Sequence, residues 1–486
     1  MGMDEFEELF ENNLGELVDE SNNGDLTIPD IETLRKMKTP EKVQILAEYV
    51  LNIQKFAVVE YSDGDVELWF FNSLTLKPNA KHRINQILTK RFPTVVTTHI
   101  VNEVERYILA MCDFVIPRSN LDPLHLLPFK NYVLDLYTLE VLDYEDCLEM
   151  GYVFTKRLPF ELDIPFLIAM EEDRVDWKQY CPTFIQFLER FYDEEDRKKL
   201  LYVLAQSFEP EIMKKKTAFV IGDPNTGKTT LKEVLLHVFG DMAATSSIYI
   251  LHKTHFSLAN LIGKRLVLLS EKPGYINAEF FKQLTGGETL PIDMKYRPLI
   301  SAPISATFVF FMNEPPLFTQ LDEAVADRIF IIYTRNPLKA GEKDPTIFVK
   351  LKSETPYILM YILYHYIKYK KGEFVVEQDI DEVYRVLMKA GSNVYDFIEE
   401  RCILDKTALI EAKKLYEEYV KWCAEKKEET LGRNTFYAHV EQYLLSNKVG
   451  CKITRSKGKV MFKGITVEAN VSDSSDWSLD EVLGGD

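Results

Sequence analysis

The chain has few cysteines and no long apolar run. Its 486 residues include six cysteines, and no two of them form a Cys-x-x-Cys pair. This scarcity argues against a disulfide-stapled domain and favours a reduced intracellular protein without a structural zinc. No apolar run approaches the ~20 residues that span a bilayer, and the first residues, MGMDEFEELFENN, are acidic where a secretory signal is basic. We therefore expect no membrane partner and a cytoplasmic location.

Basic residues are in deficit overall, but the deficit is uneven. The formal net charge is −18. Residues 1–40 carry eleven acids against three bases, and residues 469–486 carry five acids and no base. Residues 401–468 instead carry fourteen bases against nine acids. Because the sign of the charge varies by segment, the negative total does not exclude a nucleic-acid partner.

The length and the hydrophobic pattern predict several folded units. A chain of this size suggests roughly three domains. The pattern predicts an acidic flexible leader, an α+β N-terminal companion domain, an α/β core, a helical connector, a C-terminal domain and an acidic tail. Their expected bounds are 1–38, 39–175, 176–345, 346–390, 391–468 and 469–486.

In the N-terminal part, a helix is expected to begin at Thr39-Pro40, with the Thr39 hydroxyl as its cap. Residues 57–71 alternate in hydrophobicity about Asp-Gly and predict a β-hairpin. Helices are expected near 81–92 and 97–111. Residues 126–144 predict a small region of strands and turns.

The core is expected to hold a mainly parallel sheet with helices on both faces. Short, almost wholly apolar runs alternate there with helical stretches, at 217–221, 265–270, 306–312 and 328–333. The Tyr-rich helix 357–371 that follows is expected to be core rather than a binding site. Helices near 393–401, 408–427 and 434–446, then two strands within 451–468, are typical of a winged helix.

The strongest motif is Gly-x-x-x-x-Gly-Lys-Thr in 217-TAFVIGDPNTGKTTLKEVLLHVFG-240. Gly222 and Gly227 let backbone N–H groups wrap phosphates closely. Lys228 can reach the β- and γ-phosphates, and the Thr229 hydroxyl can reach Mg²⁺. The motif predicts ATP and Mg²⁺ as ligands, bound by Gly222, Asp223, Pro224, Asn225, Thr226, Gly227, Lys228, Thr229 and Thr230.

Hydrolysis also needs an acid near the γ-phosphate. Glu271 follows the apolar run 266–270 and is predicted to polarise the attacking water. Since Ser270 stands where a second acid is often found, we expect Thr229 and waters to hold the metal, with Glu271 assisting. An acid that merely ends a strand is the alternative.

Two further side chains complete the predicted catalytic set. Asn313 ends the run 306–312 and is predicted to sense the γ-phosphate; by itself, Asn before Glu-Pro-Pro is a turn residue. Arg328 can stabilise the charge that develops in the transition state, with Arg335 as a second candidate. If either acts on a neighbour's ATP, the protein is a ring or at least a dimer. A surface salt bridge is the other interpretation of Arg328.

Taken together, these motifs resemble the superfamily 3 helicases of the poxvirus, phage and plasmid primase-helicase group. The resemblance runs from about 177 to 340, and 128–142 and 391–468 are similar to the companion and C-terminal domains of that group. Its motifs are GDPNTGKTT (222–230), RLVLLSEKP (265–273), FKQLTGGETLPIDMKYRP (281–298), FFMNEPP (310–316) and ADRIF (326–330).

The resemblance implies an ATP-hydrolysing DNA helicase, usually a homo-hexameric ring of AAA+-like subunits. Such rings translocate 3′→5′ on single-stranded DNA and open forked DNA in the replication of a virus, plasmid or mobile element. A viral member would work in the host cytoplasm. The helix 276–284 and its Thr-Gly-Gly end precede residues that resemble the family's channel-facing hairpin, which implies that Lys295, Tyr296 and Arg297 contact the DNA. By itself, this triplet is more typical of a solvated loop.

Other functions are weighed against this one. An ATP-driven initiator or loader that remodels partners or origin DNA without processive unwinding is the alternative, and an RNA substrate stays open. Asp63-Gly64-Asp65 could be a primase metal site, but it is more typical of a hairpin turn, so the chain is expected to be the helicase half alone. The acidic end 473–486 is expected to be either a disordered tail or a docking peptide for a replication partner.

Overall fold

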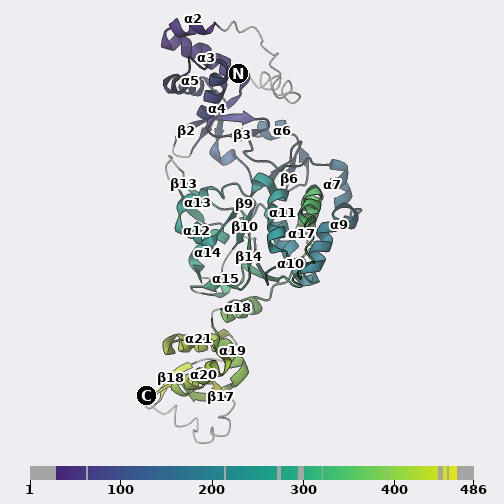
Figure 1. Cartoon of the computed structure of the whole chain (residues 1–486), viewed down its shortest axis with the longest axis vertical. Coiled ribbons are helices and arrows are strands. Elements are labelled where there is room, and N and C mark those ends of the chain that lie inside the picture. The colour runs from purple at the N-terminus through teal and green to yellow at the C-terminus, as the bar shows by residue number, and fades with distance from the viewer. Residues whose placement is uncertain are drawn as a thin grey trace.

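The computed structural model describes residues 29–61, 64–212, 215–270, 275–293, 300–319, 321–390, 392–446, 452–456 and 459–467. Three units follow one another along the longest axis, with an α/β core in the middle (Figure 1). Most of the acidic leader, and the whole acidic tail, lie outside the described residues. Within them, no helix combines the length and apolar character needed to cross a bilayer.

The core is built on a five-stranded sheet in the order β16-β8-β14-β10-β9, and every pair of neighbours is parallel. This confirms the predicted parallel sheet. Four strands coincide with the predicted apolar runs, and the fifth, β9, has the sequence AATS, which no hydrophobic run marks. The strands are β8 (Thr217–Ile221), β9 (Ala243–Ser246), β10 (Leu266–Ser270), β14 (Thr307–Met312) and β16 (Ile329–Tyr333).

Helices cover both faces of this sheet, because alternate residues of each strand enter different hydrophobic clusters. Val220 and Val309 face one layer, whereas Phe219 and Phe310 face the other. The first layer contains α7 (Ile164–Glu171), α9 (Pro182–Phe191), α10 (Glu194–Ala205), α11 (Lys228–Phe239) and α17 (Thr355–Lys370). The second contains α12 (Ile248–Lys253), α13 (His255–Ala259), α14 (Ala278–Thr285), α15 (Glu323–Ala326) and α18 (Ile380–Lys389).

The Tyr-rich helix α17 is part of the core, as its sequence indicates. Tyr366 is fully buried and its hydroxyl donates to the Leu136 carbonyl at 3.1 Å. Shorter elements complete this unit: α8 (Trp177–Tyr180), β11 (Tyr275–Ile276), β12 (Thr289–Ile292), β13 (Ile300–Pro303), β15 (Leu317–Phe318) and α16 (Ile347–Ser353).

The N-terminal unit packs helices on a four-stranded sheet of order β3-β2-β1-β4. Strands β1 and β2 are antiparallel, which confirms the predicted hairpin about Asp-Gly. The bounds are α2 (Ile31–Lys36), α3 (Thr39–Ile53), β1 (Phe56–Glu60), β2 (Val66–Asn72), β3 (Thr75–Lys77), α4 (Ala80–Arg91), α5 (Thr98–Met111) and β4 (Val115–Pro117).

The predicted Thr39 cap was wrong. Thr39 is the first helical residue of α3, and the N-cap is Lys38, which makes no side-chain cap bond. The helix can include Thr39 because the N–H groups of its first turn have no partner within the helix. The missing N–H of Pro40, the second helical residue, therefore costs no hydrogen bond.

A small sheet of β5 (Leu126–Pro128), β6 (Val133–Asp135) and β7 (Val141–Leu142), followed by α6 (Tyr144–Glu149), joins the N-terminal unit to the core. Arg265, directly before β10, donates from Nη2 to the carbonyls of Leu124 and Leu126 at 3.1 and 2.8 Å. Burial lowers the pKa of this guanidinium to about 10. The charged group therefore spans the junction between the small sheet and the core.

The C-terminal unit runs in the order helix, strand, helix, helix, strand, strand. Its elements are α19 (Val394–Arg401), β17 (Cys402–Glu411), α20 (Ala412–Lys426), α21 (Arg433–Ser446), β18 (Lys452–Ser456) and β19 (Lys459–Val467). Strands β18 and β19 are the expected pair around Ser-Lys-Gly-Lys. The helix expected from 408 begins only at Ala412, because residues up to Glu411 pair with β19.

Candidate nucleotide-binding site

The phosphate loop, residues 222–227, connects β8 to α11, as the motif predicts. Both motif glycines are required by close packing. A Cβ on Gly222 would lie 2.1 Å from the Thr334 hydroxyl, and one on Gly227 would lie 2.7 Å from the Phe187 ring. Gly227 also has a φ of +78°, which side chains rarely adopt. The loop thus folds against both β16 and α9.

A hydroxyl network fixes the loop from beneath. The Thr334 hydroxyl, just beyond β16, lies 2.7 Å from that of Thr226, which itself donates to the Asp223 carbonyl at 2.7 Å. Lys228 Nζ donates to Thr226 Oγ1 at 3.2 Å. With Thr334 as donor, Thr226 Oγ1 donates one hydrogen bond and accepts two, which is the full capacity of a hydroxyl. Both threonines are buried.

Lys228, the first residue of α11, lies over the loop. Its ammonium donates to the carbonyls of Gly222 and Asp223 at 2.5 and 2.7 Å. Partial burial lowers the pKa of Lys228, and the Asp223 carboxylate opposes that shift. The next residue, Thr229, is exposed, as are Asp223, Pro224 and Asn225, while Thr230 is half-buried. A charged amine and an exposed hydroxyl therefore stand together at the mouth of the loop.

The loop residues fit a triphosphate with its metal. The space that a Cβ would fill at Gly222 and Gly227 is already occupied by neighbouring groups, so the bare backbone forms the wall of the cradle. The first turn of α11 directs its N–H groups and the positive end of the helix dipole toward that cradle. Lys228 supplies the ammonium for phosphate oxygens, and Thr229 supplies a hard oxygen of the kind that Mg²⁺ prefers.

The tips of neighbouring strands lie on the same edge of the sheet, because all five strands are parallel. The Gly222 N–H donates to the Met312 carbonyl at 3.3 Å, which sets the exposed Asn313 beside the start of the loop. At the tip of β10, the Ser270 hydroxyl accepts from Lys232 of α11 at 2.9 Å. Glu271 comes next in the chain and lies outside the described residues.

Arg328 lies at the opposite edge. It directly precedes β16, whose Ile329 pairs with Thr217 at the start of β8. Five residues of strand, or about 16 Å, separate that edge from the phosphate loop. The half-buried guanidinium donates to the Ala324 carbonyl at 2.5 Å. Arg328 is therefore remote from the loop of its own chain.

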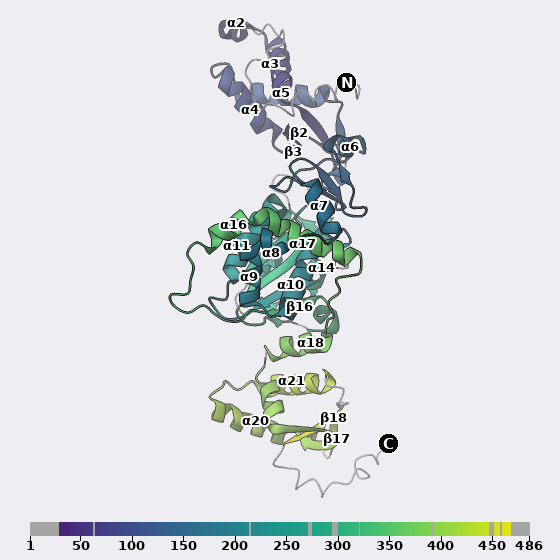
Figure 2. The same ribbon diagram turned by 90° about the vertical axis from the view of Figure 1, so that its right-hand side faces the viewer.

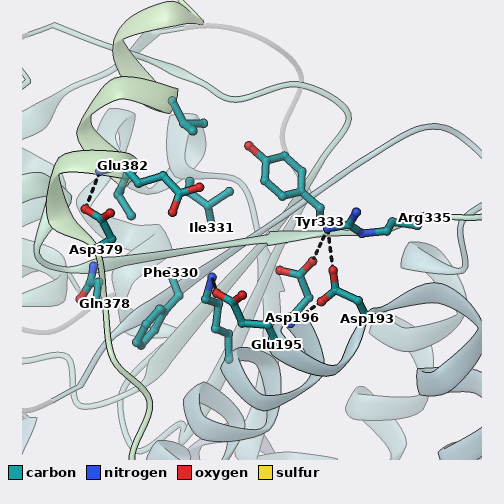
Figure 3. A pocket seen from close by; sticks show the side chains of 13 residues that line it. Asp193, Glu195, Asp196, Phe330, Ile331, Tyr333, Arg335, Gln378, Asp379 and Glu382 are labelled. Atoms are coloured by element: carbon teal, nitrogen blue, oxygen red, sulfur yellow. Dashed lines mark hydrogen bonds and ion pairs between the residues drawn. The ribbon is translucent and has the colours of Figure 1, made fainter.

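Arg335 instead lies at the edge of the sheet that carries the phosphate loop, and it forms ion pairs with acids of its own chain. Its guanidinium lies 2.6 Å from Asp193 and 3.4 Å from Asp196, at the N-terminus of α10. Burial raises the pKa of Asp196 to about 6, against a hydrogen bond from the Tyr333 backbone N–H. These groups border a cavity of about 190 Å³ between α10, β16 and α18, which no residue of the loop lines (Figure 3).

The predicted DNA-contacting residues lie between two observed strands. β12 and β13 form an antiparallel hairpin after α14, and α14 ends at Gly286 as its sequence indicates. In the sequence, Lys295, Tyr296 and Arg297 connect these strands, and they lie outside the described residues.

Sequence reasoning missed the residues that hold the loop in place. Thr334, Phe187 and Phe191 pack against the two motif glycines, but they come from elements 35 or more residues away in the chain. Only one signal pointed to Thr334: a hydroxyl directly follows the apolar run of β16, at the edge where parallel strands end.

Fold and site together define an α/β protein of the phosphate-loop class. Two family models match parts of the chain. A family of unknown function (DUF5906) matches residues 220–328, which hold the loop, Glu271, Asn313 and Arg328. The Poxvirus D5 protein-like family matches residues 392–471. This second match confirms the resemblance to the poxvirus-type group of superfamily 3 helicases.

Solved structures give a looser likeness. The apo structure of the NrS-1 C terminal region is 13% identical, with a TM-score of 0.47 over 87% of this chain and 98% of that chain. Two A-form apo structures of the same region are also 13% identical, each with a TM-score of 0.43 over 87% of this chain. They cover 99% and 98% of those chains.

Proposed function

We propose that this protein is an ATP-dependent DNA helicase that works as a ring, most simply a hexamer. It would translocate 3′→5′ on single-stranded DNA and open forks in the replication of a virus, plasmid or mobile element. One observation carries the proposal: the loop and Asn313 share one edge of the sheet, whereas Arg328 lies at the other. A subunit with this arrangement suits an active site that a neighbouring subunit completes.

Within one subunit, each residue has a defined task. The loop N–H groups and Lys228 hold the β- and γ-phosphates of ATP. Thr229, assisted by Glu271, would hold Mg²⁺, which would supply positive charge to the phosphate oxygens. Glu271 polarises the attacking water, and Asn313 orients it.

Between subunits, Arg328 acts on the neighbour's ATP. Its distance from its own loop supports this role, in which its charge would offset the negative charge of the transition state. Arg335 is already paired with Asp193 and Asp196, so moving its guanidinium to a neighbour would leave Asp196 buried without that partner.

The nucleic acid meets the hairpin of β12 and β13 in the channel, where Lys295 and Arg297 contact phosphates and Tyr296 stacks on a base. The element order of the C-terminal unit, with its closing strand pair, supports a winged helix there. The strand order of the core supports an AAA+-like subunit.

A strand-displacement assay on a forked duplex tests the proposal. The wild-type protein should unwind the fork with ATP and Mg²⁺, and Lys228→Ala should abolish both unwinding and ATP hydrolysis because the γ-phosphate loses its ammonium. ATP hydrolysis without any unwinding would favour the loader or initiator, and appreciable ATPase in Lys228→Ala would refute the assigned site.

A further inference from the structure

Helix α4 of the N-terminal unit has an unusual charge pattern. Residues 68–102, which contain it, include no Asp or Glu, although the chain holds 76 acids and has a net charge of −18. The helix itself, AKHRINQILTKR, carries only positive charges. This segment is therefore locally basic in an otherwise acidic chain.

The exposed half of α4 is polar in the middle and basic at its borders. One stripe is buried in the unit's core, formed by Ala80, Ile84, Ile87 and Leu88. At 100° per residue, Lys81 and Lys90 then fall on opposite borders of the exposed half. Exposed polar side chains lie between them, namely His82, Asn85, Gln86 and Thr89. We call this surface the α4 basic face.

Local helix stability accounts for only part of these charges, because Lys90 and Arg91 lie in the last turn, where positive charge suits the helix dipole. Lys81 instead lies in the first turn, where positive charge opposes the dipole, and the turn contains no acid. The N-cap Asn79 makes no side-chain cap bond. From α5, Glu105 lies near enough to Lys81 for the lysine to oppose the rise that burial causes in the Glu105 pKa.

We propose that the α4 basic face binds duplex DNA, with its two lysine borders on the phosphate backbones and its polar middle toward the groove. Lys81 and Lys90 are nine residues apart, or about 13 Å along the helix, which matches roughly four base pairs of duplex. A helix fits the major groove, and Asn and Gln suit base edges there. The exposed face carries no Phe, Tyr or Trp, so it lacks the large stacking rings typical of proteins that bind single strands.

The position of α4 suits this partner. The helix lies on the outer flank of the N-terminal unit, at one end of the molecule and away from the core (Figure 2). In the proposed helicase, on which this inference partly rests, duplex DNA lies outside the channel that holds the single strand. The α4 basic face would then bind the duplex ahead of the fork.

The test compares two double variants of the full chain, using fluorescence anisotropy with a labelled duplex at several salt concentrations and without ATP. The first removes the basic borders through Lys81→Gln and Lys90→Gln. The matched control removes two exposed charges from the same unit through Lys36→Gln and Lys38→Gln, which stand among acids. Thermal unfolding and basal ATPase check that both variants are folded.

The α4 variant should bind the duplex on the order of tenfold more weakly or worse, and its salt slope should fall by about 1.8 for two lost phosphate contacts. The control should change neither value. Equal losses in both variants, an unchanged slope, or weaker binding to a single strand alone would overturn the proposal. Since the readout needs neither ATP hydrolysis nor unwinding, it can fail or succeed independently of the helicase function.

Discussion

At the scale of single residues, the Thr334 hydroxyl links the end of β16 to the phosphate loop. It lies 2.7 Å from the Thr226 hydroxyl, on which Lys228 also converges, so three side chains share one fixed point. Thr334 is buried, and water cannot readily replace its hydrogen bond. We therefore regard it as a positioning residue that acts on the nucleotide through Thr226 and Lys228.

Thr334→Val keeps the shape of the side chain but removes its hydroxyl. We expect the KM for ATP to rise about tenfold, because a buried hydrogen bond lost at Thr226 costs about 1–3 kcal/mol. The kcat should change less, since no reacting atom is touched. Thr334→Ser should restore the KM. Steady-state ATPase kinetics measure both, and an unchanged KM in Thr334→Val would show that the hydroxyl has no such role.

Lys215 is a second residue with a measurable consequence. It is buried just before β8 and donates to the Ser305 carbonyl at 2.5 Å. Burial, together with the smaller effect of Arg265, lowers the pKa of Lys215 to about 7, and Glu209 opposes both. Above pH 7 the folded state therefore binds fewer protons at this site than the unfolded state, whose lysine keeps a pKa near 10.5. The contribution of Lys215 to stability must rise with pH between these two values.

Lys215→Met should flatten that dependence. The wild-type free energy of unfolding should gain a positive contribution between about pH 7 and pH 10, and the variant should lack it and be more stable at pH 6. Urea unfolding at a series of pH values measures both proteins. If the difference between their free energies of unfolding stays constant across this range, Lys215 is not buried in its neutral form.

At the scale of elements, the hairpin of β12 and β13 carries the proposed contact with DNA. Lys295→Ala should leave basal ATPase intact, because the hairpin contributes no residue to the phosphate loop. It should abolish the stimulation of ATPase by single-stranded DNA, since the phosphate contact is lost. ATPase assays with and without oligonucleotide measure this, and unchanged stimulation would remove Lys295 from the channel.

The elements that sequence could predict are those whose signal is local. The run TAFVI, the glycines around Lys228 and the helix after them specify strand, loop and helix within 24 residues. Strand β9 could not be predicted because AATS is short and polar, and its place in the sheet depends on pairing with β10. β17 escaped for the same kind of reason: much of CILDKTALIE is exposed, and β19 holds it in the sheet.

The site shows the same division. The motif located the loop, and the strand ends located Asn313. No local pattern could reveal that Thr334 and Phe187 would pack against Gly222 and Gly227, since these contacts depend on the register of β16 and on the docking of α9.

At the scale of the whole molecule, the proposed ring divides each active site between two subunits. Glu271→Gln should lose hydrolysis at its own site but keep its Arg328, and Arg328→Ala should keep its own Glu271. Mixing the two inactive variants should recover a little ATPase, because some interfaces combine an intact acid with an intact arginine. ATPase measured over a range of mixing ratios tests this. No recovery at any ratio would place Arg328 outside the neighbour's site.

The arrangement of the three units has a directional consequence. The end of the molecule that carries α4 and the end that carries β17 and β18 lie on opposite sides of the core (Figures 1 and 2). In the proposed ring, the channel therefore has two chemically different openings, one at each of these ends. Photo-crosslinkers placed at the two openings would react with different termini of a bound oligonucleotide, and the pattern of crosslinks would give its orientation directly.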